Sequence, residues 1–110
     1  MNEYRTLQEI CKIAGVSRRA VQGYEKAGLV SPVDRNKYGH LLYGMEEIEK
    51  ITKIKFLQEI RFSIKEIMIL INGSESDLKI ALRKQLPILC EEKVKLEELI
   101  NQVEALLNDK

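Results

Sequence analysis

The sequence predicts a mainly α-helical fold, in which a winged helix-turn-helix over residues 1–75 precedes a C-terminal coiled-coil dimerisation helix over residues 76–110. Three observations support this prediction. Two short segments with helical periodicity are joined by a three-residue turn that contains Gly15. A stretch around Pro32 and Gly39 then interrupts the helical pattern. Finally, an aliphatic residue recurs every seven positions near the end of the chain.

The composition fits one small helical domain with its positive charge at the front. The 110 residues are 45% hydrophobic, but they include only four Tyr, two Phe and no Trp, so we expect an aliphatic core. The net charge is +1. Residues 1–45 hold seven basic and four acidic residues, a net +3, whereas residues 46–110 hold eleven and thirteen, a net −2. The first part of the chain is therefore the part expected to meet a polyanion.

The first two helices have local start and stop signals. Thr6 and Glu9 form a capping box, and Gly15 ends the helix that follows. Ser17 caps the second helix, which is expected to end at Gly28. Both helices have apolar residues at helical spacing, so each is expected to bury one face. This arrangement predicts a helix-turn-helix.

The middle of the chain predicts a wing and two further helices. Residues 29–43 contain two apolar runs around a polar stretch, which indicates a two-stranded hairpin. Helical periodicity returns from Met45 to about Ile60. Ser63 and Glu66 form a second capping box, which opens a fourth helix closed by residues 72–73. Residues 73–77 are then expected to form a loop.

The last segment predicts a coiled-coil seam. Leu82, Leu89, Leu96 and Val103 recur every seven residues, and Leu86, Ile100 and Leu107 lie four positions after three of them. A terminal helix of this length has no equal partner in the chain, so we expect an antiparallel homodimer. Pro87 permits two arrangements: a short helix over residues 78–84 before a long one, or a single helix kinked at Pro87. We favour the first.

Two groups of residues are candidates for nucleic-acid contact. At the start of the second helix, Ser17, Arg18, Arg19 and Gln22 are placed where such helices meet the major groove, and Arg and Gln can pair with guanine and adenine edges. In the hairpin, Arg35, Lys37 and Tyr38 form a basic and aromatic cluster suited to the sugar-phosphate backbone. Tyr43 is assigned to phosphate as well, with closure of the core as its alternative role. Double-stranded DNA is the predicted partner.

The same residues give little support for catalysis or metal binding. His40 is the single histidine and has no catalytic or metal-ligand partner at a recognised spacing. Cys11 and Cys90 lie 79 positions apart and are expected to act as small apolar residues. We expect no enzyme activity, cofactor or metal. The sequence shows neither a signal peptide nor a membrane span, so the protein is expected in the cytoplasm and not in a membrane.

The segments VSRRAVQGYEKAGLV, YGHLLY and KIKFLQEIRFSIKEI resemble the MerR family of bacterial transcription regulators along essentially the whole chain. The positions that match the family pattern are Ser17, Arg19, Tyr24, Glu25, Gly28, Leu29, Gly39, Leu42, Tyr43, Phe62, Ser63, Glu66 and Ile67. The chain departs from the pattern at Gln22-Gly23, at His40-Leu41 and at Arg61, where the family has Arg-Tyr, Tyr-Arg and Gly. The first two departures remove expected DNA contacts, which gives Arg18 and the wing tip more weight.

The resemblance implies a homodimeric regulator that binds a pseudo-palindromic promoter site and bends and untwists it so that RNA polymerase can engage. Because the sequence ends at Lys110, a short member without a C-terminal effector domain is expected. Two alternatives stay open. One is an architectural, excisionase-like DNA-bending protein. The other is a coiled-coil protein-interaction module that has lost DNA binding.

Overall fold

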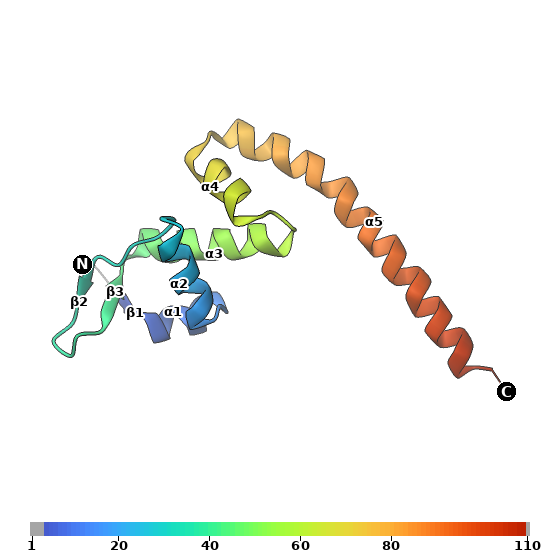
Figure 1. The fold of residues 1–110 in the computed structure, drawn as a ribbon, viewed down its shortest axis with the longest axis horizontal. Coiled ribbons are helices and arrows are strands. Elements are labelled where there is room, and N and C mark those ends of the chain that lie inside the picture. Colours follow the sequence, from blue (N-terminus) through green and yellow to red (C-terminus); the bar gives the residue numbers. More distant parts are fainter. Residues whose placement is uncertain (1–3, 110) are drawn as a thin grey trace. The chain divides into compact units, whose positions relative to one another are not determined.

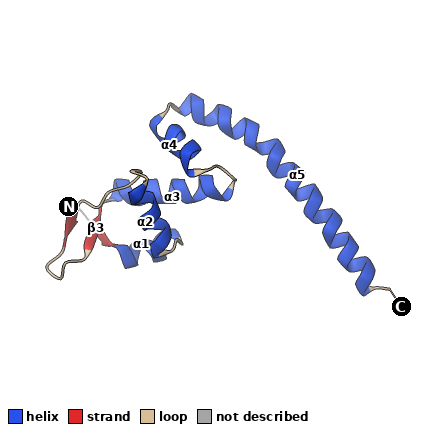
Figure 2. Cartoon of the chain, viewed as in Figure 1, coloured by secondary structure: helices blue, strands red, loops and turns tan. Residues whose placement is uncertain are grey.

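The computed structural model describes residues 4–109 and contains five helices and three short strands within that range (Figure 1). In chain order the elements are β1 (Arg5–Thr6), α1 (Leu7–Ala14), α2 (Arg18–Lys26), β2 (Asp34–Arg35), β3 (Leu41–Tyr43), α3 (Met45–Glu59), α4 (Ile64–Asn72) and α5 (Glu75–Leu107). Helices predominate, as Figure 2 shows. The chain forms two compact units, the first ending at Ile69 and the second beginning at Leu70. No helix in residues 4–109 has the length and apolar character needed to cross a membrane.

Helix α3 supplies much of the core of the first unit. It buries Ile48, Ile51, Ile54 and Leu57, which recur at helical spacing on one face. Helices α1 and α2 and strand β3 lie around this core, with α1 in contact with α2, α3 and β3. The remaining buried hydrophobic residues are Ile10, Val21, Tyr24, Leu29, Val30, Tyr43, Phe62 and Ile67. Aliphatic residues outnumber aromatic ones in this core, as the composition predicted. Burial of each large aliphatic side chain stabilises the fold by about 1.5–3 kcal/mol.

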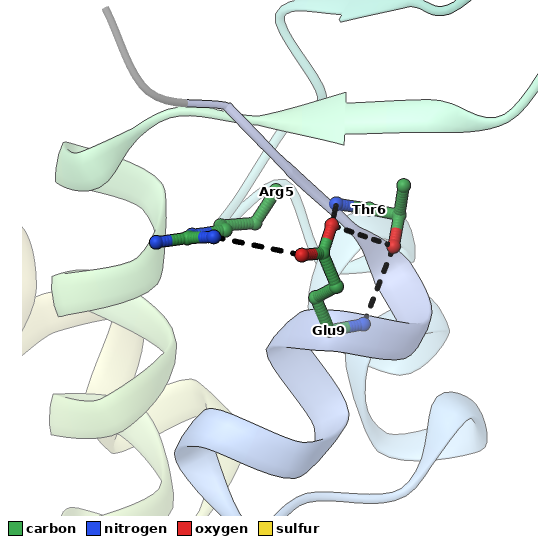
Figure 3. Close-up of polar contacts among 3 residues, drawn as sticks. All are labelled: Arg5, Thr6 and Glu9. Carbon is green, nitrogen blue, oxygen red and sulfur yellow. Dashed lines mark hydrogen bonds and ion pairs between the residues drawn. The ribbon is translucent and has the colours of Figure 1, made fainter.

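The predicted capping signals are confirmed. The Glu9 amide donates to Thr6 Oγ1 at 3.3 Å, and the Thr6 amide donates to Glu9 Oε1 at 3.0 Å (Figure 3). An ion pair of 3.5 Å joins Arg5 Nη1 to Glu9 Oε2. Ser63 and Glu66 form the same reciprocal pair at the start of α4. Gly15 closes α1 in the left-handed conformation at φ 66°, whereas α2 ends at Lys26, slightly before Gly28.

These caps make part of the stability depend on pH. Hydrogen bonds from the backbone amides of Thr6 and Ser63, followed by those from their hydroxyls, lower the pKa of Glu9 and Glu66. A carboxylate whose pKa is lowered by folding stabilises the fold above its unfolded pKa. That contribution is lost as the pH falls through the lowered folded pKa. The caps are therefore intact at neutral pH and weaken only in acid.

The predicted hairpin is present, and a third strand joins it. Strand β3 pairs antiparallel with β2, placing Asp34 opposite Leu42, and on its other edge with β1, placing Arg5 opposite Tyr43. The sequence did not reveal β1, because two residues show no alternation. The hairpin turns at Gly39, whose φ of 81° lies in the left-handed region that favours glycine.

Arg61 also has a positive φ, 82°. It occupies the position at which the resembled family pattern has glycine. A non-glycine residue in this conformation costs about 1–2 kcal/mol, which explains a preference for glycine there. The Arg61 guanidinium donates to the Glu59 carbonyl at 2.8 Å, a local bond that offsets part of this cost.

The favoured arrangement at Pro87 is wrong. Helix α5 runs without a break from Glu75 to Leu107 and contains Pro87 within it. Proline removes one donor, to the carbonyl four residues earlier, at a cost of about 3 kcal/mol. Long runs of good helix formers on both sides keep the helix continuous. The expected loop over residues 73–77 is also too long, because Ser74 and Asp77 form a capping box that starts the helix at Glu75.

Candidate nucleic-acid interface

Helix α2 is held by polar contacts on its inner side. Tyr24 is buried and its hydroxyl donates to Gln58 Oε1 of α3 at 2.6 Å. Tyr43 of β3 donates its hydroxyl to the Glu25 carboxylate. These two bonds fix α2 against both α3 and the sheet. Burial raises the pKa of Tyr24, and burial together with the Glu25 carboxylate raises that of Tyr43, so both remain hydrogen-bond donors at neutral pH.

Tyr43 is thus not a surface residue. Its exposed fraction is 0%, and its hydroxyl is engaged with Glu25. The assignment of Tyr43 to phosphate is corrected, and the alternative role in the core holds. The physical reason is the register of β3, which turns this side chain inward.

The other candidate residues of α2 lie on its outer side. Ser17 caps the helix by accepting from the Ala20 amide at 3.0 Å. Arg18, Arg19 and Gln22 are all exposed and lie within the first one and a half turns after that cap. The inner face is occupied by Val21 and Tyr24, so the outer face is left to basic and amide side chains.

A hollow of about 280 Å³, called here the wing hollow, separates α2 from the hairpin. It is lined by Thr6, Leu7 and Gln8 at the start of α1, by Arg18 and Gln22 of α2, and by Gly39, His40 and Leu41 of the hairpin. Three elements that are distant in sequence therefore share one concave surface. The sequence did not predict that Gln8 and His40 line the wing hollow, because no local pattern indicates which loop faces which helix.

A second, more open hollow of about 600 Å³, called here the outer hollow, lies along α2. It is lined by Arg19, Gln22, Gly23, Glu25 and Lys26. Lys26 was not among the sequence candidates, although its spacing of four from Gln22 and seven from Arg19 places it on the same helix face. Gln22 lines both hollows.

The wing tip is organised by its own hydrogen bonds. Asn36 Oδ1 accepts from the amides of Tyr38 at 2.9 Å and His40 at 3.0 Å. Arg35 donates from Nη1 to the Gly39 carbonyl at 2.7 Å, so part of its guanidinium braces the turn. Lys37 lies 5.2 Å from the centre of the Tyr38 ring, which is 72% exposed. A cation and an aromatic ring thus project together from a fixed turn.

The predicted seam of α5 presents apolar side chains. Ile100 is 53% exposed and Leu107 78% exposed, and Leu96 and Val103 are exposed as well. Leu82 and Leu89, nearer the start of the helix, are half-buried. One side of the C-terminal half of α5 is thus an apolar stripe within a single chain.

Comparison with known proteins identifies the family and two related transcriptional activators. Residues 5–74 match the model of the MerR HTH family of regulatory proteins. The Bacillus subtilis HTH-type transcriptional activator mta is 30% identical over 92% of this chain, and the Streptomyces coelicolor activator TipA is 28% identical over 87%. The chain spans only 39% and 38% of those two proteins, respectively.

Solved structures agree with the fold. The N-terminal part of the multidrug transporter activator of B. subtilis, MtaN, superposes with a TM-score of 0.69 at 28% identity, covering 96% of this chain and 99% of that one. HiNmlR, described as a MerR family regulator lacking the sensor domain and bound to promoter DNA, has a TM-score of 0.72 at 19% identity over 96% of this chain and 88% of its own. These likenesses confirm the predicted fold class.

Proposed function

The chain belongs to the MerR family of helix-turn-helix regulatory proteins, because residues 5–74 match the model of that family, and on this ground we propose that it binds double-stranded DNA as a homodimeric transcription regulator. One observation supports this most strongly. The outer face of α2 presents Arg18, Arg19 and Gln22 between two hollows, beside a basic wing. The relatives mta and TipA are named transcriptional activators, which favours regulation over catalysis.

Two parts of the chain have separate roles in this proposed function. Residues 1–75 bind DNA: Arg18, Arg19 and Gln22 contact base edges, while Ser17, Arg35, Lys37 and Tyr38 contact the backbone. Residues 76–110 form the dimer through the following side chains of α5: Leu82, Leu89, Leu96, Ile100, Val103 and Leu107. Two copies then bind a pseudo-palindromic promoter site in the cytoplasm, bending and untwisting it for RNA polymerase.

Transcription in a purified system tests this regulatory role. A template carries the protein's own selected site between its promoter elements, and transcript is measured with and without protein, alongside DNA bending by gel mobility. The proposal expects bending together with a change in transcript. Bending with no change in transcript would instead indicate an architectural protein, and absence of binding would indicate a protein-interaction module.

Removing the wing cation should weaken all DNA binding alike. Lys37→Ala deletes an exposed charge that contacts no base in this account, so specific and random duplexes should lose affinity equally. The slope of log affinity against log salt should fall by about one per protomer. Fluorescence anisotropy titrations at several salt concentrations measure both quantities. A loss confined to the specific duplex would contradict a backbone role for Lys37.

Gly23 should be more important for the complex than for the free protein. A Cβ built at Gly23 meets nothing within 4 Å, and the residue is helical, so Gly23→Ala should stabilise the free protein by about 0.5–1 kcal/mol. Because Gly23 lines the outer hollow beside Arg19, the added methyl group should obstruct close approach of DNA and weaken binding. Urea unfolding and anisotropy measure the two effects.

Gly39→Ala provides a contrast for this variant. Gly39 also has open space around its Cβ position but has a φ of 81°, so alanine there should destabilise the fold by about 1–2 kcal/mol. For Gly23→Ala itself, the contradicting outcome is a protein that is more stable than wild type and still binds DNA with wild-type affinity. That outcome would show that DNA does not approach this part of α2.

A further inference from the structure

His40 lies at the edge of the wing hollow, opposite α2. Its backbone is fixed on both sides: the His40 amide donates to Asn36 Oδ1 at 3.0 Å, and the His40 carbonyl accepts from the Asn36 amide at 2.9 Å. The imidazole is exposed, and its ring centre lies 6.4 Å from that of Tyr38. Arg18 lines the same hollow from the opposite wall. The turn thus holds His40 at a hollow that Arg18 also lines, on a surface that the proposed function assigns to DNA.

The surroundings of His40 favour an anion. The cations and the phenol on the elements around the hollow are Arg18 of α2 and, from the wing, Arg35, Lys37 and Tyr38. Two carboxylates lie on the same elements: Asp34 of β2, which accepts from the Arg35 amide at 2.7 Å, and Glu9 of α1, which accepts from Thr6 and pairs with Arg5. The start of α1 contributes Thr6, Leu7 and Gln8, which are uncharged. None of the described residues that line the hollow has a carboxylate. A negative ligand there would meet donors on the lining itself, while the nearby carboxylates of Asp34 and Glu9 are already engaged by Arg35, Thr6 and Arg5.

We propose that His40 is a further DNA-contacting residue, whose protonated imidazole pairs with a phosphodiester held in the wing hollow, so that the protein binds DNA more tightly as the pH falls. The proposal rests on the proposed DNA-binding function and adds a pH dependence to it. Imidazole is the side chain that ordinarily changes charge between about pH 5 and 8. A phosphodiester keeps its negative charge throughout this range, so it favours the protonated form and binding takes up a proton.

The composition of the chain makes this effect separable. His40 is the only histidine among the 110 residues, so no other imidazole contributes between pH 5.5 and 7.5. Glu9 and Glu66 have pKa values lowered from 4.5 by their caps, so they stay ionised over this interval. The caps of α1 and α4 therefore contribute no change in affinity between these two pH values. An α-amino group also changes charge in this interval, so the comparison with His40→Gln, which keeps every other titratable group, isolates the contribution of His40.

The expected size follows from ion release. One additional ionic contact per protomer steepens the dependence of log affinity on log salt by about 0.9. For each fourfold reduction in salt concentration, the ratio of the affinity at pH 5.5 to the affinity at pH 7.5 should therefore rise by about 3.5-fold per protomer. His40→Gln keeps a polar side chain without the charge, and His40→Lys keeps a positive charge throughout the interval.

The experiment is a set of anisotropy titrations on one labelled duplex at pH 5.5 and 7.5 and at four salt concentrations. Wild type, His40→Gln and His40→Lys are compared, with circular dichroism verifying the fold at both pH values. Wild type should show the steeper slope at pH 5.5. His40→Gln should have the shallow slope at both pH values, and His40→Lys the steep slope at both.

Two results would overturn the proposal while leaving DNA binding intact. The first is a wild-type slope that does not change with pH. The second is a pH dependence that persists in His40→Gln, since the proton would then be taken up elsewhere. Failure of all three proteins to bind any duplex at either pH is a different result, and it would overturn the proposed function itself.

Discussion

Replacing Ile100 with glutamate should convert the proposed homodimer into a monomer and abolish tight binding to a site with two half-sites. Ile100 is 53% exposed and lies on the apolar stripe of α5 between Leu96 and Val103. A charge buried in that seam would have no partner, which strongly disfavours pairing. Because the dimer makes the second half-site an intramolecular contact, affinity for a two-half-site duplex should fall by about 10²- to 10⁴-fold. Analytical ultracentrifugation and anisotropy measure the two changes.

A matched control introduces the same residue one position further along. Asn101→Glu places the carboxylate about 100° around the helix from Ile100, away from the stripe. This variant should remain dimeric and bind normally. Affinity for a duplex with a single half-site should be little changed in Ile100→Glu, because α2 and the wing are intact. A dimer that survives Ile100→Glu would contradict the assignment of α5.

The second large effect is expected at Arg19. Arg19 is exposed, one residue inside the start of α2, and lines the outer hollow with Gln22. A guanidinium in the major groove can donate two hydrogen bonds to one guanine, so Arg19→Ala should weaken specific binding by about 1–3 kcal/mol per protomer. It should also relax the preference for the base at that position. Competition among duplexes that differ at single base pairs measures both effects.

Lys12→Ala is the control for charge alone. Lys12 is an exposed residue of α1 that lines neither hollow, so its removal should alter DNA affinity far less than that of Arg19. If Arg19→Ala weakened binding to specific and random duplexes to the same extent, Arg19 would be a backbone contact and not a base reader.

Much of the first unit could be predicted because its signals are local. The capping boxes at Thr6 and Ser63 and the Gly15 terminator each lie within a few residues of the helix end they define. Strand β1 could not be predicted in this way. It has two residues, and its identity depends on pairing with Tyr43 and Leu42, far along the chain.

The wrong predictions at Pro87 and Tyr43 arose because local signals were overridden by longer-range structure. Pro87 is a strong local signal against a helix, yet α5 continues through it because about a dozen residues before it and twenty after it favour helix. Tyr43 appeared available to phosphate until the register of β3 placed it in the core. The spacing of α2 predicted its outer face, but the wing hollow joins residues from three elements, and only the tertiary fold brings Gln8, Arg18 and His40 together.

Selection of duplexes from a random library by the purified protein tests the central proposal most directly. It is carried out at about 150 mM salt, because low salt would favour nonspecific binding to any sequence. A homodimer that reads bases through α2 should recover an inverted repeat, with two half-sites at a fixed spacing. Recovery of sequences with no common motif would contradict a sequence-specific dimeric regulator.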